Sequence, residues 1–192
     1  DNMYFIGNPP WGATISEETR NKIAEIYGLD KDNLNSFEAF LLLPSVVGSL
    51  KTMYIIPRNF IRTNDYEGAR KKLLEEQNLL SVGDFGACFE GVTQEAVTVE
   101  YSGIEIPKKG VELMPFAKNE DFKVYGHIKQ KHILDDSKTR FNLLFAEELE
   151  HLAGKMECET VSLTDYVEHF RGIEYGKSGE VTECTSCGSH NS

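Results

Sequence analysis

The chain has 192 residues, of which 40% are hydrophobic and 27% carry a charge. This composition is that of a folded globular domain and excludes an intrinsically disordered chain. The net charge of -11 argues against a protein whose whole surface binds nucleic acid, although it is compatible with a narrow basic groove. No apolar run approaches the roughly 20 residues that a membrane-spanning helix needs.

The ends and the cysteines add two expectations. The first residues lack the basic and then apolar pattern of a secretory signal, and they already resemble a strand, so we expect a segment of a longer protein. The four cysteines are Cys88, Cys158, Cys184 and Cys187, and only the last two are close together. Because this spacing gives no disulfide framework, a reducing cytoplasm is expected.

The first elements expected along the chain are a strand and two helices. Residues 3–7 form a short apolar run that ends in Gly-Asn-Pro-Pro, which predicts a buried strand stopped by a rigid turn. Residues 16–27 have apolar side chains at helical spacing, with Gly28 as a stop signal. Residues 36 to about 50 are apolar over a helical length, and Pro44 should kink or split this helix.

Three further strands and one helix are expected before residue 102. The predicted strands are residues 52–56, 80–85 and 96–101. Asn64 and Glu67 resemble a capping box that opens the helix. One face of that helix is apolar and should be buried: Tyr66, Ala69, Leu73 and Leu74.

Strands that alternate with helices predict an α/β fold with a parallel sheet. The link between residues 80–85 and 96–101 is too short for a helical crossover, so these strands should be antiparallel neighbours. From residue 102 to about 138 the sequence is polar and has no clear period. A helix is expected after it, with an apolar face formed by Phe141, Leu144, Phe145, Leu149 and Leu152.

The segment Asn8-Pro9-Pro10-Trp11 carries the clearest chemical signal. It follows a predicted strand, and ligands of open α/β sheets bind at the carboxyl ends of strands. The carboxamide oxygen of Asn8 can accept a hydrogen bond from an amino group, while the two prolines stiffen the loop and remove competing backbone donors. Two acceptors around an exocyclic amine would localise its lone pair for attack, and Trp11 offers a flat face for stacking a planar ring.

This loop resembles the Asn-Pro-Pro-aromatic motif of amino-methyltransferases that use S-adenosylmethionine, in particular the adenine-specific DNA methyltransferases of restriction-modification systems. Further similar segments are residues 35–37, 53–60, 83–86, 89 and 92–93. The resemblance covers most of residues 1–101, and residues 165–177 are weakly similar to the entry of a target-recognition domain. The family's Gly-rich cofactor turn is absent from this sequence, and Gly48-Ser49-Leu50-Lys51 replaces its usual Lys-Pro-Gly-Gly turn.

The resemblance implies a partial Rossmann-like methyltransferase sheet. This would be its C-terminal half, with parallel strands, one antiparallel strand, helices and a C-terminal extension. The whole Asn8, Pro9, Pro10, Trp11 loop would be catalytic, and Trp11 and Phe89 would stack on an adenine flipped out of the duplex. Phe37 would line the S-adenosylmethionine pocket, although a core position suits this residue equally well. The implied partners are DNA and the N-terminal half that binds the cofactor, so this segment alone should be inactive.

Three regions are therefore predicted. Residues 1–101 are the C-terminal half of the catalytic domain, residues 102–154 a polar extension with a helix, and residues 155–192 a linker and the start of a target-recognition domain. Cys184 and Cys187 have the spacing of half a zinc site, with His190 as an unusually placed third ligand. Because a structural zinc needs four ligands, this pattern favours a chain without zinc.

Two other functions are compatible with the sequence. A methyltransferase with the same motif could modify a protein glutamine amide or RNA, but such enzymes usually end soon after the last strand, and this chain continues well past Tyr101. The third interpretation is a non-catalytic binding fragment in which the Asn-Pro-Pro-Trp segment is a plain turn. Because the resemblance implies that a strand of the absent cofactor half lies beside residues 3–7, this strand should form an open apolar edge of the sheet. Such an edge invites either self-association or cover by another segment.

Overall fold

The computed structural model describes residues 3–144 except 92, 108 and 120, together with residues 152, 155, 161, 166 and 167. The chain divides into two compact units, Asp1–Ala153 and Gly154–Ser192. The first unit contains all of the helices and strands named below.

The elements follow one another in this order: β1 (Tyr4–Gly7), α1 (Glu17–Tyr27), α2 (Ser36–Val47), β2 (Lys51–Pro57), the 3-10 helices η1 (Arg58–Ile61) and η2 (Asn64–Tyr66), α3 (Glu67–Glu76), β3 (Asn78–Gly86), β4 (Ala96–Ser102), β5 (Val111–Met114), β6 (Gly126–Ile128) and α4 (Gln130–Asp135). The strands and helices predicted before residue 102 are confirmed, with small shifts at their ends.

The strands form one mixed sheet in the order β1-β2-β4-β3-β5-β6. Strands β1, β2, β3 and β5 run in one direction, and β4 and β6 run in the other. The predicted α/β class is confirmed, as is the antiparallel pairing of β3 with β4. The sheet has a second reversed strand, β6, in a region for which no element was predicted.

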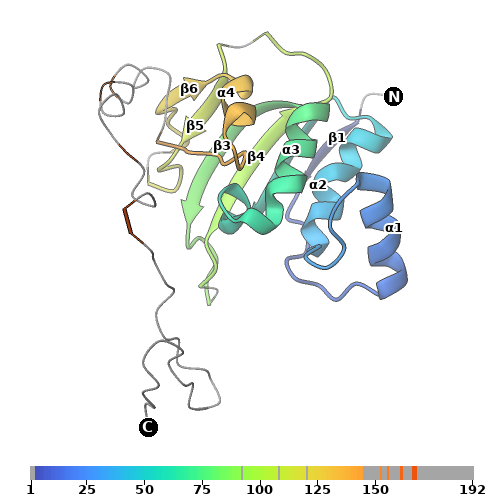
Figure 1. Ribbon diagram of the computed structural model, residues 1–192. Helices are drawn as coiled ribbons and strands as arrows, with labels where there is room; N and C mark the ends of the chain where they lie inside the picture. Colours follow the sequence, from blue (N-terminus) through green and yellow to red (C-terminus); the bar gives the residue numbers. More distant parts are fainter. Residues whose placement is uncertain are drawn as a thin grey trace. The chain divides into compact units, whose positions relative to one another are not determined.

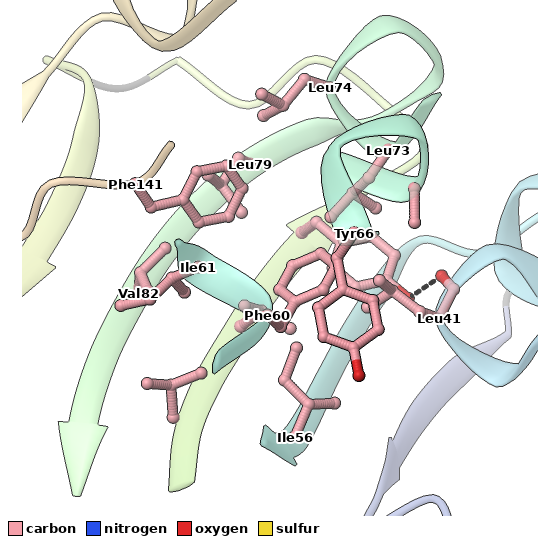
Figure 2. Close-up of a cluster of buried hydrophobic side chains, with 14 of the residues drawn as sticks. Leu41, Ile56, Phe60, Ile61, Tyr66, Leu73, Leu74, Leu79, Val82 and Phe141 are labelled. Atoms are coloured by element: carbon pink, nitrogen blue, oxygen red, sulfur yellow. Dashed lines mark hydrogen bonds between the residues drawn. The ribbon is translucent and has the colours of Figure 1, made fainter. Parts of the chain in front are cut away.

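The core lies between the sheet and the helices that cover one of its faces (Figure 1). Side chains of β2 alternate between buried and partly buried, and Tyr54 and Ile56 point into this core. Figure 2 shows the aromatic centre of the core, where the rings of Phe60 and Phe141 pack edge to face. The hydroxyl of Tyr101 donates a 2.6 Å hydrogen bond to the carbonyl of Leu41 on α2 (Figure 2, dashed line), which ties this helix to the sheet.

One sequence prediction about a helix boundary is wrong. Asn64 makes no capping hydrogen bond, because a 3-10 turn precedes α3 and places Asn64 inside it. The capping box lies instead at the start of α2, where the Glu38 carboxylate accepts a 2.6 Å hydrogen bond from the Asn35 backbone N–H. Helix α2 runs without a break through Pro44, so the proline does not split it.

The region after residue 102 differs most from prediction. Strands β5 and β6 have four and three residues, which is too short for a periodic pattern to be recognised. The helix predicted from Phe141 does not start there, because residues 141–144 are irregular or in a turn. Phe141 is nevertheless buried in the core. Phe145 and Leu149 lie outside the described residues.

Strand β1 lies at the edge of the sheet, as predicted, and pairs only with β2 among the described strands. The prediction of a buried strand is wrong for one face of β1, because Tyr4 and Ile6 are 70% and 83% exposed. Both project from the sheet face opposite to Phe5, which packs against the core. The edge strand therefore presents apolar side chains to solvent.

Candidate functional site

The Asn8–Trp11 loop begins at the carboxyl end of β1, where the sequence predicted it. Pro9 is buried, Trp11 is partly buried, and Asn8 and Pro10 are exposed. Among the described residues, the Asn8 carboxamide has no hydrogen-bond partner. Its oxygen and amide are therefore free to meet a ligand at this end of the sheet.

The start of α2 holds the loop from the side. The Ser36 hydroxyl donates a 2.7 Å hydrogen bond to the carbonyl of Pro10 and accepts one of 3.0 Å from the Ala13 N–H. The Asn35 carboxamide oxygen accepts a 3.0 Å hydrogen bond from the Gly12 N–H. Gly12 has φ 69°, a left-handed conformation that glycine adopts without strain. These contacts fix the chain directly after the Asn-Pro-Pro segment.

Residues 35–37 were recognisable from the sequence only through their resemblance to a family, and the anchoring role of Asn35 and Ser36 was not predicted. The sequence does contain a signal for this helix start, since Asn35 followed three positions later by Glu38 is a capping-box pattern. The carboxylate of Glu38 is 3% exposed. Burial raises the pKa of Glu38 to about 7, against the opposing effect of the Asn35 hydrogen bond.

Trp11 and Phe89 come together although they are far apart in the sequence. Their ring centroids are 5.7 Å apart, and the ring planes meet at 73°, an edge-to-face contact. The Trp11 indole N–H also points to the carbonyl of Ile55 on β2, at 3.4 Å. Because the two rings touch each other, a base could be stacked between them only if the rings moved apart. The structure therefore brings the predicted pair together without an open slot.

Phe37, the weaker candidate, has no exposed surface and packs edge to face with Phe60 and Tyr66. In this structure it is a core side chain, and its contact with a cofactor remains a prediction. Cys184, Cys187 and His190 lie outside the described residues, as do residues 168–177 of the weak tail resemblance. Within the described part of the chain, no three His, Cys, Asp or Glu side chains gather as a metal site would require.

A cluster of charged side chains at the strand ends was not recognised from the sequence. The Arg58 guanidinium, just after β2, forms an ion pair of 2.9 Å with Asp84 at the end of β3 and a second ion pair with Glu95 before β4. The backbone N–H of Arg58 also donates to the Glu95 carbonyl at 2.8 Å. The hydrogen bond to Glu95 raises the pKa of Arg58, with a further contribution from Asp84. The cluster fixes three strand ends beside one another.

The sequence matches no protein-family model and no curated protein. Several solved structures match part of this chain. The ATP-dependent Type ISP restriction-modification enzyme LlaBIII bound to DNA is 16% identical over 58% of this chain and 10% of that chain, with a TM-score of 0.43. A chain from a structure of a type I restriction-modification system is 16% identical. The match covers 67% of this chain and 27% of that chain, with a TM-score of 0.40.

A third structure is a modification subunit assigned to a type I restriction enzyme of Vibrio vulnificus YJ016. It is 12% identical over 92% of this chain and 36% of that chain, with a TM-score of 0.41. The chain thus spans between 10% and 36% of the length of these proteins. Within its described part, the chain has no helix with the length and hydropathy needed to cross a bilayer.

Proposed function

We propose that this chain forms the target-base part of an S-adenosylmethionine-dependent methyltransferase. Its substrate is the exocyclic amino group of adenine in DNA, and the enzyme belongs to a restriction-modification system. The observation that carries this proposal is the Asn8 carboxamide, which is exposed and unpaired among the described residues at the carboxyl end of β1. The loop that bears it is fixed by Ser36 and Asn35.

The roles of the loop follow from its hydrogen-bonding groups. The Asn8 carboxamide oxygen accepts a hydrogen bond from the adenine amino group, and a backbone carbonyl of the proline pair supplies a second acceptor. Together these acceptors direct the nitrogen lone pair away from the ring, toward the incoming methyl group. The cofactor supplies that activated methyl group. No residue needs to remove a proton first, because the amine can lose it after transfer.

The aromatic pair favours a planar ring as the substrate over a glutamine side chain. Trp11 and Phe89 approach from two different elements, and stacking on such rings offsets the cost of extruding a base. The 5.7 Å contact between them must open when the base enters. Residue Phe37 is buried here, so we propose that most cofactor contacts come from another part of the enzyme.

The test is methylation of duplex DNA by the protein at its full natural length, followed by nucleoside mass spectrometry for N6-methyladenine. Asn8→Ala should lower kcat about a hundredfold or more, because it removes a group that acts mainly in the transition state. DNA affinity should be nearly unchanged. Asn33→Ala is the matched control, since Asn33 is exposed and bonds only to Asp30 at 3.1 Å. Near-normal turnover by Asn8→Ala would exclude the role assigned to Asn8.

A further inference from the structure

Two cavities share one arginine, Arg62. The first has a volume of about 390 Å³ and is lined by Arg58, Asn59, Arg62, Thr93, Gln94 and Glu95. The second, of about 510 Å³, is lined by Arg62, Asp136, Arg140, Phe141 and Asn142. We call the two together the Arg62 groove.

The charges in the Arg62 groove are balanced except at Arg62. Arg58 is held by Asp84 and Glu95, and Arg140 is held by Asp136 through contacts of 3.2 and 3.0 Å. Within the described part of the chain, the exposed guanidinium of Arg62 has no carboxylate partner. The chain as a whole has a net charge of -11, so an unneutralised cation in a groove is a specific feature.

The rest of the lining consists largely of uncharged hydrogen-bonding groups. Asn59, Gln94 and Asn142 contribute carboxamides, and Thr93 contributes a hydroxyl. One free guanidinium among amides and a hydroxyl suits a ligand with a single negative charge per unit and several neutral acceptors. The sugar-phosphate backbone of a nucleic acid has this chemistry, and amides and hydroxyls are frequent ligands of phosphate and sugar oxygens.

The first of the two cavities is lined by segments that continue from the candidate base site, while the second adds residues that follow α4. Trp11 is bonded to Ile55 of β2, and β2 leads directly into Arg58 and η1. Phe89 belongs to the loop between β3 and β4, which continues to Thr93 and Gln94. Chain continuity therefore links the Trp11 and Phe89 pair to the first cavity of the groove.

Buried hydrogen bonds hold the walls of the groove in place. The fully buried Arg70 donates to the carbonyls of Phe60 and Thr63 on one wall, at 2.6 and 2.8 Å. The same guanidinium donates to the carbonyls of Lys138 and Thr139 on the other wall, each at 2.8 Å. Because a planar guanidinium spreads its donors in a rigid fork, Arg70 fixes the spacing of the two segments. The groove is therefore formed before any ligand arrives.

We propose that the Arg62 groove binds the sugar-phosphate backbone of the DNA strand that carries the target adenine, with Arg62 as the ligand of one phosphate. This inference rests on the proposed function and adds a strand-binding site to it. Phosphate contacts of this kind position a strand without reading its sequence. Arg62 thus sets the register of the target strand, while the Asn8–Trp11 loop acts on the base.

The test is the salt dependence of DNA binding by the full-length protein, measured by fluorescence anisotropy between about 50 and 200 mM salt. Arg62→Gln should weaken binding at every sequence and reduce the slope of log affinity against log salt by about one. Arg62→Lys should restore most of the slope, because it keeps the charge. Lys22→Gln is the matched control, since Lys22 lies on α1 and is paired with Glu18 at 2.6 Å.

The measurements distinguish an error in the assigned strand-binding site from an error in the proposed function. If Arg62→Gln keeps the wild-type slope while Asn8→Ala abolishes methylation, the groove is not the strand-binding site and the function stands. If Arg62→Gln lowers kcat at saturating DNA but leaves the slope unchanged, Arg62 serves the chemical step and the inference is equally overturned. If the wild-type protein neither methylates nor binds DNA, the proposed function itself is wrong.

Discussion

The Ser36 hydroxyl and the Pro10 carbonyl are joined by a 2.7 Å hydrogen bond that connects the start of α2 to the Asn8–Trp11 loop. The same hydroxyl accepts from the Ala13 N–H at 3.0 Å, so one side chain spans four residues of the loop and its exit. A stiff proline pair determines the local shape of the loop but not its place relative to the sheet. Ser36 supplies that placement.

Ser36→Ala should therefore lower kcat with little change in DNA affinity. It should also cost about 1 kcal/mol of stability, the usual contribution of one hydrogen bond. Ser45→Ala is the control in the same helix, because Ser45 donates a 2.7 Å hydrogen bond to the Leu42 carbonyl away from the loop. Thermal unfolding and methylation kinetics measure both effects. The positioning role is wrong if the two variants have equal turnover, and Ser36→Thr should recover part of kcat.

The contact between Trp11 and Phe89 predicts a dependence on the target base. Phe89→Ala should weaken binding to DNA that contains the target adenine by about tenfold, since stacking on an aromatic side chain contributes about 1–3 kcal/mol per base. DNA with an abasic site at that position should bind the wild type and Phe89→Ala with equal affinity, because no base remains to stack. Tyr125→Ala, at a half-exposed tyrosine in another loop, is the control. An equal loss on both DNAs would show that Phe89 acts on folding or on the backbone.

The helices and strands that could be predicted are those in which the pattern of apolar residues extends over enough positions to be recognised. Helix α1 followed from its apolar spacing and from Gly28, which does adopt the left-handed conformation at φ 65°. Strand β4 followed from regular alternation of Val97, Val99 and Tyr101 with their neighbours. Strands β5 and β6 could not be predicted, because pairing with β3 and with each other, rather than their own composition, makes them strands.

The candidate site likewise has one part that could be predicted from the sequence and one part that could not. The Asn8–Trp11 loop was recognisable because its residue types are local and unusual. The cluster of Arg58, Asp84 and Glu95 was not, because each residue follows or precedes a different strand and only the strand order brings them together. A charged residue at a strand end has no sequence signal that separates a partner from a solvated side chain. Tertiary contacts of this kind have to be read from the structure.

Glu38 predicts a fall in stability as the pH rises. Burial raises its pKa from an ordinary value of 4.5 to about 7, so the folded protein binds a proton that the unfolded chain has lost between these values. The proton on Glu38 therefore contributes fully to the free energy of unfolding below about pH 4.5, and this contribution declines as the pH rises to about 7. Above that pH the protein is less stable by about 3 kcal/mol, and Glu38 causes no further change.

Urea unfolding of the wild type and Glu38→Gln at pH 5 and pH 8 measures this contribution. Glutamine keeps the acceptor for the Asn35 N–H but does not ionise, so Glu38→Gln should be the more stable protein at pH 8 and the difference should shrink at pH 5. Groups common to both proteins cancel in this comparison. An identical pH dependence in the two proteins would mean that Glu38 keeps an ordinary pKa.

Strand β1 predicts self-association of this 192-residue chain. Among the described strands β1 pairs only with β2, so its outer edge presents backbone donors and acceptors next to the exposed Tyr4 and Ile6. Such an apolar edge pairs readily with a strand of another molecule.

Analytical ultracentrifugation should show association that grows with concentration and is weakened by Ile6→Lys, because a lysine there places charge on the shared surface. Ile26→Lys is the control, since Ile26 is 63% exposed on α1, away from the edge. A wild-type chain that stays monomeric at high concentration, or equal effects of the two lysines, would show that the β1 edge is not the associating surface.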